Sequence, residues 1–130
     1  MNEQIIRSET PTIFLAMFWG GGGPYTIPQI IGVYDWVNRA TPSREDMETA
    51  LNTLLCMKLI EQKGDTFSIP REQHAAFDAF RKKKRKGRFE NVRLYFEQLP
   101  EVTEIPTGIR LTAEAYEGHL RENRRAFREA

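Results

Sequence analysis

Seven positively charged side chains fall within one short segment of the chain. Residues 81–88 read RKKKRKGR. Taking these seven from the 19 basic residues of the chain leaves 12 against 18 acidic ones, so this segment carries all of the excess positive charge. Clustered lysine and arginine side chains neutralise several phosphates at once, which is what sequence-independent binding of nucleic acid requires. The candidate phosphate contacts are Arg81, Lys82, Lys83, Lys84, Arg85, Lys86 and Arg88.

Two other interpretations of segment 81–88 stay open. If the segment is helical, its charges surround the helix axis and cannot all face one partner. They then form a solvated face that pairs with acidic residues elsewhere, for example Glu45, Asp46 and Glu48 of another subunit. A third interpretation is attraction to an anionic membrane surface. The neighbouring apolar residues fit a protein core, which disfavours the membrane.

The chain carries no pattern that marks an enzyme active site. Cys56 lies in an apolar, helical run far from His74 and His119, so we expect a small buried hydrophobic residue and not a nucleophile. Neither histidine has a cysteine or a carboxylate pair at metal-ligand spacing. The glycine tract 20–23 lacks the Lys-Ser/Thr pair of a phosphate-binding loop, and it predicts a linker or a helix cap. We therefore expect no catalysis, no metal, no cofactor and no small-molecule substrate.

Length and composition indicate one globular unit with at most a small extension. The chain has 130 residues, of which 40% are apolar and 28% charged, so one core can form without covalent crosslinks. A single cysteine cannot form an internal disulfide. The first ten residues are polar and show no signal-peptide pattern, and the longest apolar run, 13–19, is too short to span a bilayer. We therefore expect a cytoplasmic protein without a membrane partner.

Hydrophobic periodicity predicts the elements that position these residues. Helices are expected at 11–19, at 28–39, from residue 43 through an apolar stripe that ends near residue 55, at 71–86, at 88–99 and at 112–128. Ser43 followed by Asp46 approximates a capping box, and Thr112 fits the cap of the last helix. The runs 59–62 and 66–69 flank a Gly-Asp turn and predict a β-hairpin. The fold class is therefore mainly α with a small β-hairpin.

The order of helix, helix, tight turn, helix and hairpin resembles the winged helix-turn-helix superfamily. The stretch 43–69, SREDMETALNTLLCMKLIEQKGDTFSI, is similar to the third helix and wing of such proteins, with Leu54-Leu55 in the helix and Phe67 and Ile69 ending the hairpin. Residues 26–39 look like the preceding helix. The resemblance implies an N-terminal tail at 1–9, a winged helix-turn-helix domain at 10–70 and a C-terminal helical extension at 71–130 that packs on it. It is specific for fold and not for target.

The resemblance also implies a DNA-reading surface. In winged-helix regulators the third helix enters the major groove and exposes polar side chains to the bases. This chain departs from that pattern, because the first turns of the helix hold three acidic residues against one arginine, and phosphates repel such a helix. The wing has Lys63, which Asp65 offsets. The base-side candidates are Ser43, Arg44, Thr49, Asn52 and Thr53, with Lys63 in the wing.

Two functions fit these features. The first, which we favour, is a nucleic-acid-binding protein, with DNA as the expected partner and transcription regulation as one role. In this hypothesis segment 81–88 contacts the phosphates of the nucleic acid, and a homodimer presents two winged helices. The second is a protein–protein interaction or dimerisation module that keeps the winged-helix fold without DNA binding. The acidic third helix and the long helices after the hairpin favour the second. Trp36 lies off the main stripe of its helix, which fits either a partner contact or the flank of the core.

Overall fold

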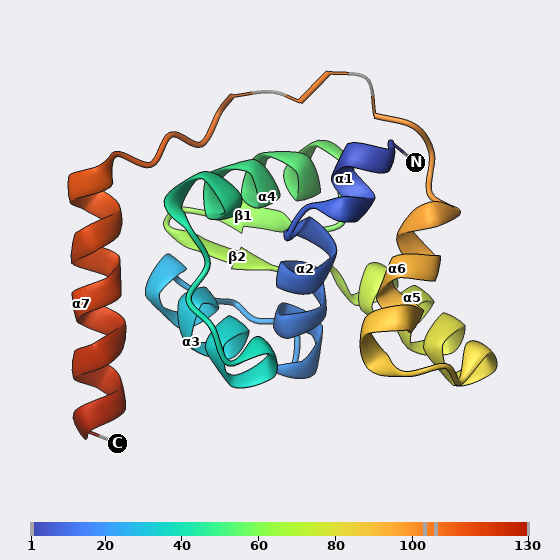
Figure 1. Ribbon diagram of the computed structural model, residues 1–130, viewed down its shortest axis with the longest axis horizontal. Coiled ribbons are helices and arrows are strands. Elements are labelled where there is room, and N and C mark those ends of the chain that lie inside the picture. Colours follow the sequence, from blue (N-terminus) through green and yellow to red (C-terminus); the bar gives the residue numbers. More distant parts are fainter. Residues whose placement is uncertain (1, 103, 106, 130) are drawn as a thin grey trace.

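The computed structural model describes residues 2–102, 104–105 and 107–129, with side chains described as far as residue 126. Its described residues are mainly helical and include a two-stranded antiparallel sheet (Figure 1). The elements in chain order are α1 Glu3–Arg7, α2 Thr10–Trp19, α3 Ile27–Asn38, α4 Arg44–Cys56, β1 Glu61–Lys63, β2 Thr66–Ser68, α5 Arg71–Lys84, α6 Arg88–Glu97 and α7 Ala113–Glu129.

Helix α2 lies at the centre of the molecule and contacts α3, α4 and α6 (Figure 1). Every side chain from Ile13 to Phe18 is buried, as expected for a helix with little polar face. The ring of Phe14 meets Phe77 of α5 and Phe96 of α6 edge to face, with centroids 5.6 and 5.7 Å apart. These contacts join α5 and α6 to the same core as α2, α3 and α4.

Strands β1 and β2 confirm the predicted hairpin. Lys63 lies opposite Thr66, and Gly64 has a φ of +61°, a conformation that glycine adopts without steric cost. Tyr25, between α2 and α3, extends the sheet by one residue. Its backbone N–H donates to the carbonyl of Phe67 at 2.8 Å, and the N–H of Phe67 donates to the carbonyl of Tyr25 at 2.7 Å.

The glycine tract 20–23 caps α2, as predicted, and its lack of side chains lets the hairpin pack closely against it. Gly20 is the C-cap residue, and its N–H donates to the carbonyl of Ala16. A Cβ at Gly23 would lie 2.7 Å from the carbonyl oxygen of Phe67, so only glycine permits this approach without a backbone shift.

Helix α1 was not expected from the sequence, in which residues 1–9 are treated as a tail. The side chain of Asn2 caps it by accepting from the N–H of Gln4 at 2.8 Å. Ile5 is buried and joins the core. The helix spans five residues, too few for hydrophobic periodicity to indicate it.

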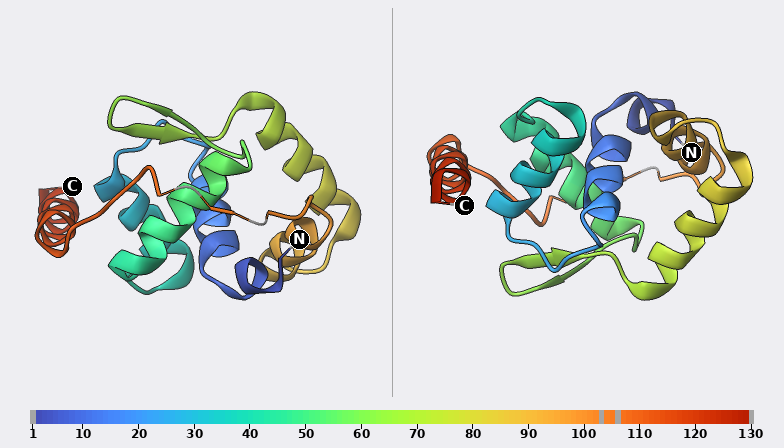
Figure 2. Two further views of the ribbon diagram at one scale, coloured as in Figure 1. Left: turned by 90° about the horizontal axis from the view of Figure 1, so that it is seen from above. Right: turned by 90° about the horizontal axis from the view of Figure 1, so that it is seen from below.

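Helix α7 packs on α3, at the opposite end of the molecule from α6 (Figures 1 and 2). Thr112 accepts from the N–H of Ala115 at 3.0 Å, as predicted for the N-cap. A Cβ at Gly32 would lie 2.9 Å from Asn123 Oδ1, so this glycine permits close helix packing. The buried Tyr116 donates its hydroxyl hydrogen to the carbonyl of Pro42 at 2.6 Å, and burial raises its pKa to about 12.

The chain between α6 and α7 passes over α4 (Figure 1). Its last part, residues 107–112, is called the strap below. The strap has no helix or strand of its own. Its position on α4 determines which of the predicted site residues are accessible.

Candidate nucleic-acid interface

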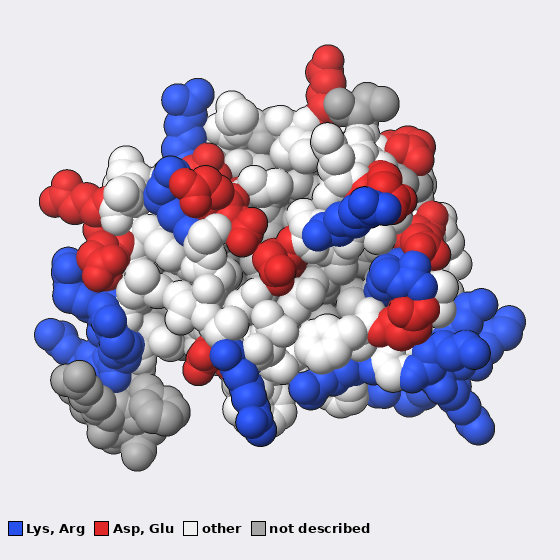
Figure 3. Space-filling view, viewed as in Figure 1, with Lys and Arg blue, Asp and Glu red and all other residues white. Residues whose placement is uncertain are grey.

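Four of the predicted phosphate contacts are exposed at the turn between α5 and α6. This group, here called the basic corner, consists of Lys83, Lys84, Arg85 and Lys86. Arg85 is the C-cap residue of α5 in the left-handed conformation, with φ 54°, so the chain turns sharply there. Figure 3 shows the blue side chains gathered at this end of the molecule. Within the described part of the chain, no ion pair involves any of the four.

The other three predicted phosphate contacts, Arg81, Lys82 and Arg88, form polar contacts with other parts of the protein. Arg85 of the basic corner also donates from Nε to the carbonyl of Lys82 at 3.2 Å. Asp78 pairs with Arg81 at 2.6 Å and with Lys82 at 3.0 Å. The hydrogen bond from Lys82, and after it that from Arg81, holds the pKa of Asp78 below its usual value. Arg88 donates from Nη2 to the carbonyl of Val37 at 3.0 Å. The side chain of Lys82 is still 66% exposed and can add to the corner.

The strap covers one face of α4. Arg44 donates from Nη1 to the carbonyl of Leu111 at 2.9 Å, and the N–H of Leu111 donates to Glu48 Oε2 at 2.5 Å. Asn52 donates from Nδ2 to the carbonyl of Ile109 at 2.8 Å and accepts the N–H of the same residue at 2.7 Å. Arg44, Glu48 and Asn52 are four residues apart and therefore share a helix face. That face binds the extended main chain of the strap.

The burial of α4 overturns part of the predicted base-contacting set. Asn52 is 7% exposed beneath the strap, and Thr53 is fully buried, with no hydrogen-bond partner for its hydroxyl among the described residues. Neither side chain can reach a base in this structure. Arg44 is half-buried by its contact with the strap, whereas Ser43 and Thr49 are exposed. The hydroxyl of Ser43 accepts from the N–H of Asp46 at 3.1 Å, which confirms the predicted N-cap.

The predicted wing residue Lys63 is exposed on β1, but it lies far from the basic corner. Figure 2 shows the tip of the hairpin and the turn between α5 and α6 at opposite ends of the molecule. The structure therefore does not bring the predicted residues together into one surface. The predicted residues fall into two groups, one on α4 and the hairpin and the other at the basic corner.

A cluster that sequence reasoning missed lies beside α5. The guanidinium of Arg81 lies over the rings of Phe18 and Trp19, 5.3 and 5.0 Å from their centroids. The imidazole of His74 packs on Phe18 at 4.4 Å. Next to it is a hollow of about 360 Å³, lined by Gly21, Ile69, Arg71, His74 and Ala75. The sequence signal for this cluster was the recurrence of polar residues at helical spacing along α5, which places them on the side of the helix that borders the cluster.

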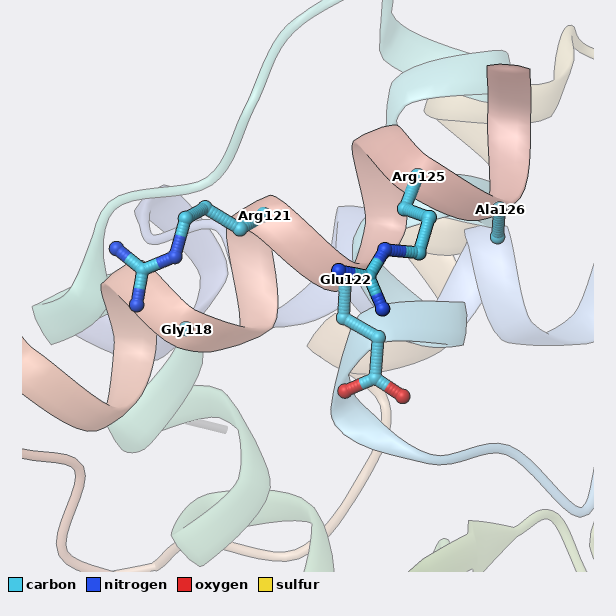
Figure 4. A pocket seen from close by; sticks show the side chains of 5 residues that line it. All are labelled: Gly118, Arg121, Glu122, Arg125 and Ala126. Atoms are coloured by element: carbon cyan, nitrogen blue, oxygen red, sulfur yellow. The ribbon is translucent and has the colours of Figure 1, made fainter. Parts of the chain in front are cut away.

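Two further hollows have less defined chemistry. One, of about 420 Å³, lies between the end of α4 and the chain after α6, and its lining includes Cys56, Met57, Leu59 and Leu99. Cys56 is exposed there, contrary to the expected burial, and its Sγ donates to the carbonyl of Glu104 at 3.8 Å. The other, of about 460 Å³, is lined by Gly118, Arg121, Glu122, Arg125 and Ala126 (Figure 4). These five residues all lie on α7, so this hollow is a surface depression along one helix.

The described residues provide neither a cluster of metal ligands nor a membrane-spanning helix. Among them, no group of three or more histidine, cysteine, aspartate or glutamate side chains is placed to hold a metal ion. None of the helices they form combines the length and the apolar character needed to cross a bilayer. Comparison of the chain with protein families, with curated proteins and with solved structures finds no match in any of the three.

Proposed function

We propose that this chain is a winged-helix protein that binds nucleic acid, with DNA as its expected partner, through phosphates at the basic corner. The order of elements supports the winged-helix assignment. Helices α3 and α4 are joined by the short connection 39–43, as in a helix-turn-helix, and a hairpin follows them. The pairing of Tyr25 with Phe67 ties the segment before α3 to that hairpin.

The observation that carries the binding proposal is the exposure of four cations at one turn without an ion-pair partner in the described chain. Side chains that already pair with carboxylates gain little from a phosphate, because the existing pair must be broken. Exposed, unpaired cations release the counterions of the nucleic acid when they meet its phosphates, and this release drives association. The basic corner meets that requirement, and the acidic start of α4 does not.

The proposal is limited to contacts with the nucleic-acid backbone. A transcription regulator that reads a sequence through α4 needs that helix to be accessible, and the strap covers the face that holds Arg44, Glu48 and Asn52. Binding is therefore expected to depend little on base sequence, since phosphate contacts carry no sequence information directly.

The salt dependence of duplex binding tests the proposed function. A fluorescent duplex of random sequence is titrated with the protein at about 50 and about 200 mM salt. Four phosphate contacts predict an affinity about 150-fold weaker at the higher concentration. An affinity that is the same at both concentrations, or no binding by the folded protein at the lower one, would refute the proposed function.

A second function, protein–protein interaction or dimerisation, is favoured by a different observation. The α4 face binds an extended main chain by hydrogen bonds, a task that another polypeptide could perform in place of the strap. Trp36 is also 71% exposed on α3, which fits the predicted partner contact better than the flank of a core. Sedimentation at increasing protein concentration distinguishes self-association from a monomer.

A further inference from the structure

We propose that the face of α5 next to Trp19 binds a single strand of nucleic acid, with one base stacked on Trp19 and the phosphates along α5 to the basic corner. This inference rests on the proposed function and specifies the form of its ligand. Besides the cations of segment 81–88, it uses Trp19, Arg71 and His74, which are not among the nucleic-acid contacts predicted from the sequence.

Trp19 is held in place as a stacking surface. It is the last residue of α2, 40% exposed, and the glycine tract 20–23 follows it. Phe18 meets its ring edge to face at 5.8 Å, and the guanidinium of Arg81 lies 5.0 Å from its centroid. A base can stack on an aromatic ring that is already ordered without an added loss of side-chain entropy.

The hollow beside Trp19 has the chemistry of an anion site. Arg71 and His74 line it from the first turns of α5, and Gly21 lines it from the loop after Trp19. Both the Arg71 guanidinium and the N-terminal end of a 14-residue helix favour a negatively charged group. A phosphate next to the base on Trp19 fits this hollow.

The spacing along α5 continues the same face toward the basic corner. His74, Asp78 and Lys82 follow Arg71 at steps of three or four residues, so they share one side of the helix, and the C-cap residue Arg85 comes after them. Asp78 is the carboxylate on this side, and two cations already neutralise it. The 14 residues of α5 span about 21 Å. Figure 2 shows α5 running from the base of the hairpin to the basic corner.

A single strand suits this face better than a duplex. The bases of a duplex are stacked inside the helix and cannot lie on a protein ring without being unpaired, whereas a single strand presents its bases. The aromatic ring, the cationic hollow and the basic corner combine the two features of single-strand binding, a stacking surface and a positive track.

The test uses the intrinsic fluorescence of Trp19. The chain has two tryptophans, so Trp36→Phe leaves Trp19 as the sole reporter. This variant is titrated with oligothymidine and with oligouridine of about eight nucleotides, and with a DNA duplex of equal length. We expect saturable quenching by a single strand and none by the duplex. The matched control, Trp19→Phe, keeps Trp36 alone and is expected to show no quenching.

An affinity measurement completes the test. Trp19→Ala is expected to weaken single-strand binding by about 10-fold and to leave duplex binding unchanged. Quenching by only one of the two oligonucleotides would assign the ligand as DNA or RNA. Salt-dependent duplex binding with no quenching of Trp19 would overturn this inference and leave the proposed function intact. No binding of any nucleic acid by the folded protein would overturn both.

Discussion

Replacement of three lysines of the basic corner, Lys83, Lys84 and Lys86, by glutamine is expected to weaken duplex binding at about 50 mM salt by about 100-fold or more. Each lysine removed takes away one phosphate contact and the counterions that it releases. The three side chains are exposed and form no ion pair in the described chain, so we expect the fold to be retained. The change also removes the contact of Lys84 Nζ with the ring of Phe80, 5.6 Å from its centroid. Fluorescence anisotropy with a labelled duplex measures the affinity, and circular dichroism checks the fold.

The control for this variant removes the same charge elsewhere. Lys63, Arg110 and Arg121 are exposed on the hairpin, on the strap and on α7, and none of them is part of the basic corner. Changing these three to glutamine is expected to alter the affinity by only a few-fold, through the net charge. Equal losses in the two variants would mean that overall charge, and not the basic corner, determines binding.

Asn52→Ala is expected to lower the free energy of unfolding by about 2 kcal/mol. The substitution removes two hydrogen bonds and leaves the N–H and the carbonyl of Ile109 without their partner on α4. Urea denaturation measures the loss, and hydrogen exchange at the amide of Ile109 reports whether the strap separates from α4.

Thr49→Ala serves as the comparison, since Thr49 is exposed on the same helix. This change is expected to alter the free energy of unfolding by less than about 0.5 kcal/mol. If Asn52→Ala unfolds like the unaltered protein and the exchange at Ile109 is unchanged, the strap is not held to α4 as described.

Features determined by a few adjacent residues were predictable from the sequence. The N-caps at Ser43 and Thr112 and the hairpin turn at Gly64 were expected and are present, because each depends on local backbone chemistry. The described helices α2 to α7 also correspond to the predicted apolar stripes. Helix α1 was not predicted, because a five-residue helix is shorter than the window in which hydrophobic periodicity can be recognised.

The accessibility of the site residues was not predictable in the same way. Asn52 follows the exposed Thr49 on α4, and nothing local indicates that the strap, more than 50 residues later in the chain, covers its side chain. Likewise, the contacts of Arg81 with Phe18 and Trp19 join α5 to α2. The basic composition of segment 81–88 was visible, but which charges remain free depends on Asp78 and on the carbonyl of Val37.

The location of bound DNA is tested most directly by lysine acetylation of the protein with and without a saturating duplex. Mass spectrometry gives the rate at each lysine. The proposed interface predicts that Lys83, Lys84 and Lys86 are protected by the duplex, while Lys58 and Lys63, both exposed, react as in the free protein. Protection of Lys63 on the hairpin, with unchanged rates at the basic corner, would contradict the proposed interface and place the DNA against α4 and the hairpin.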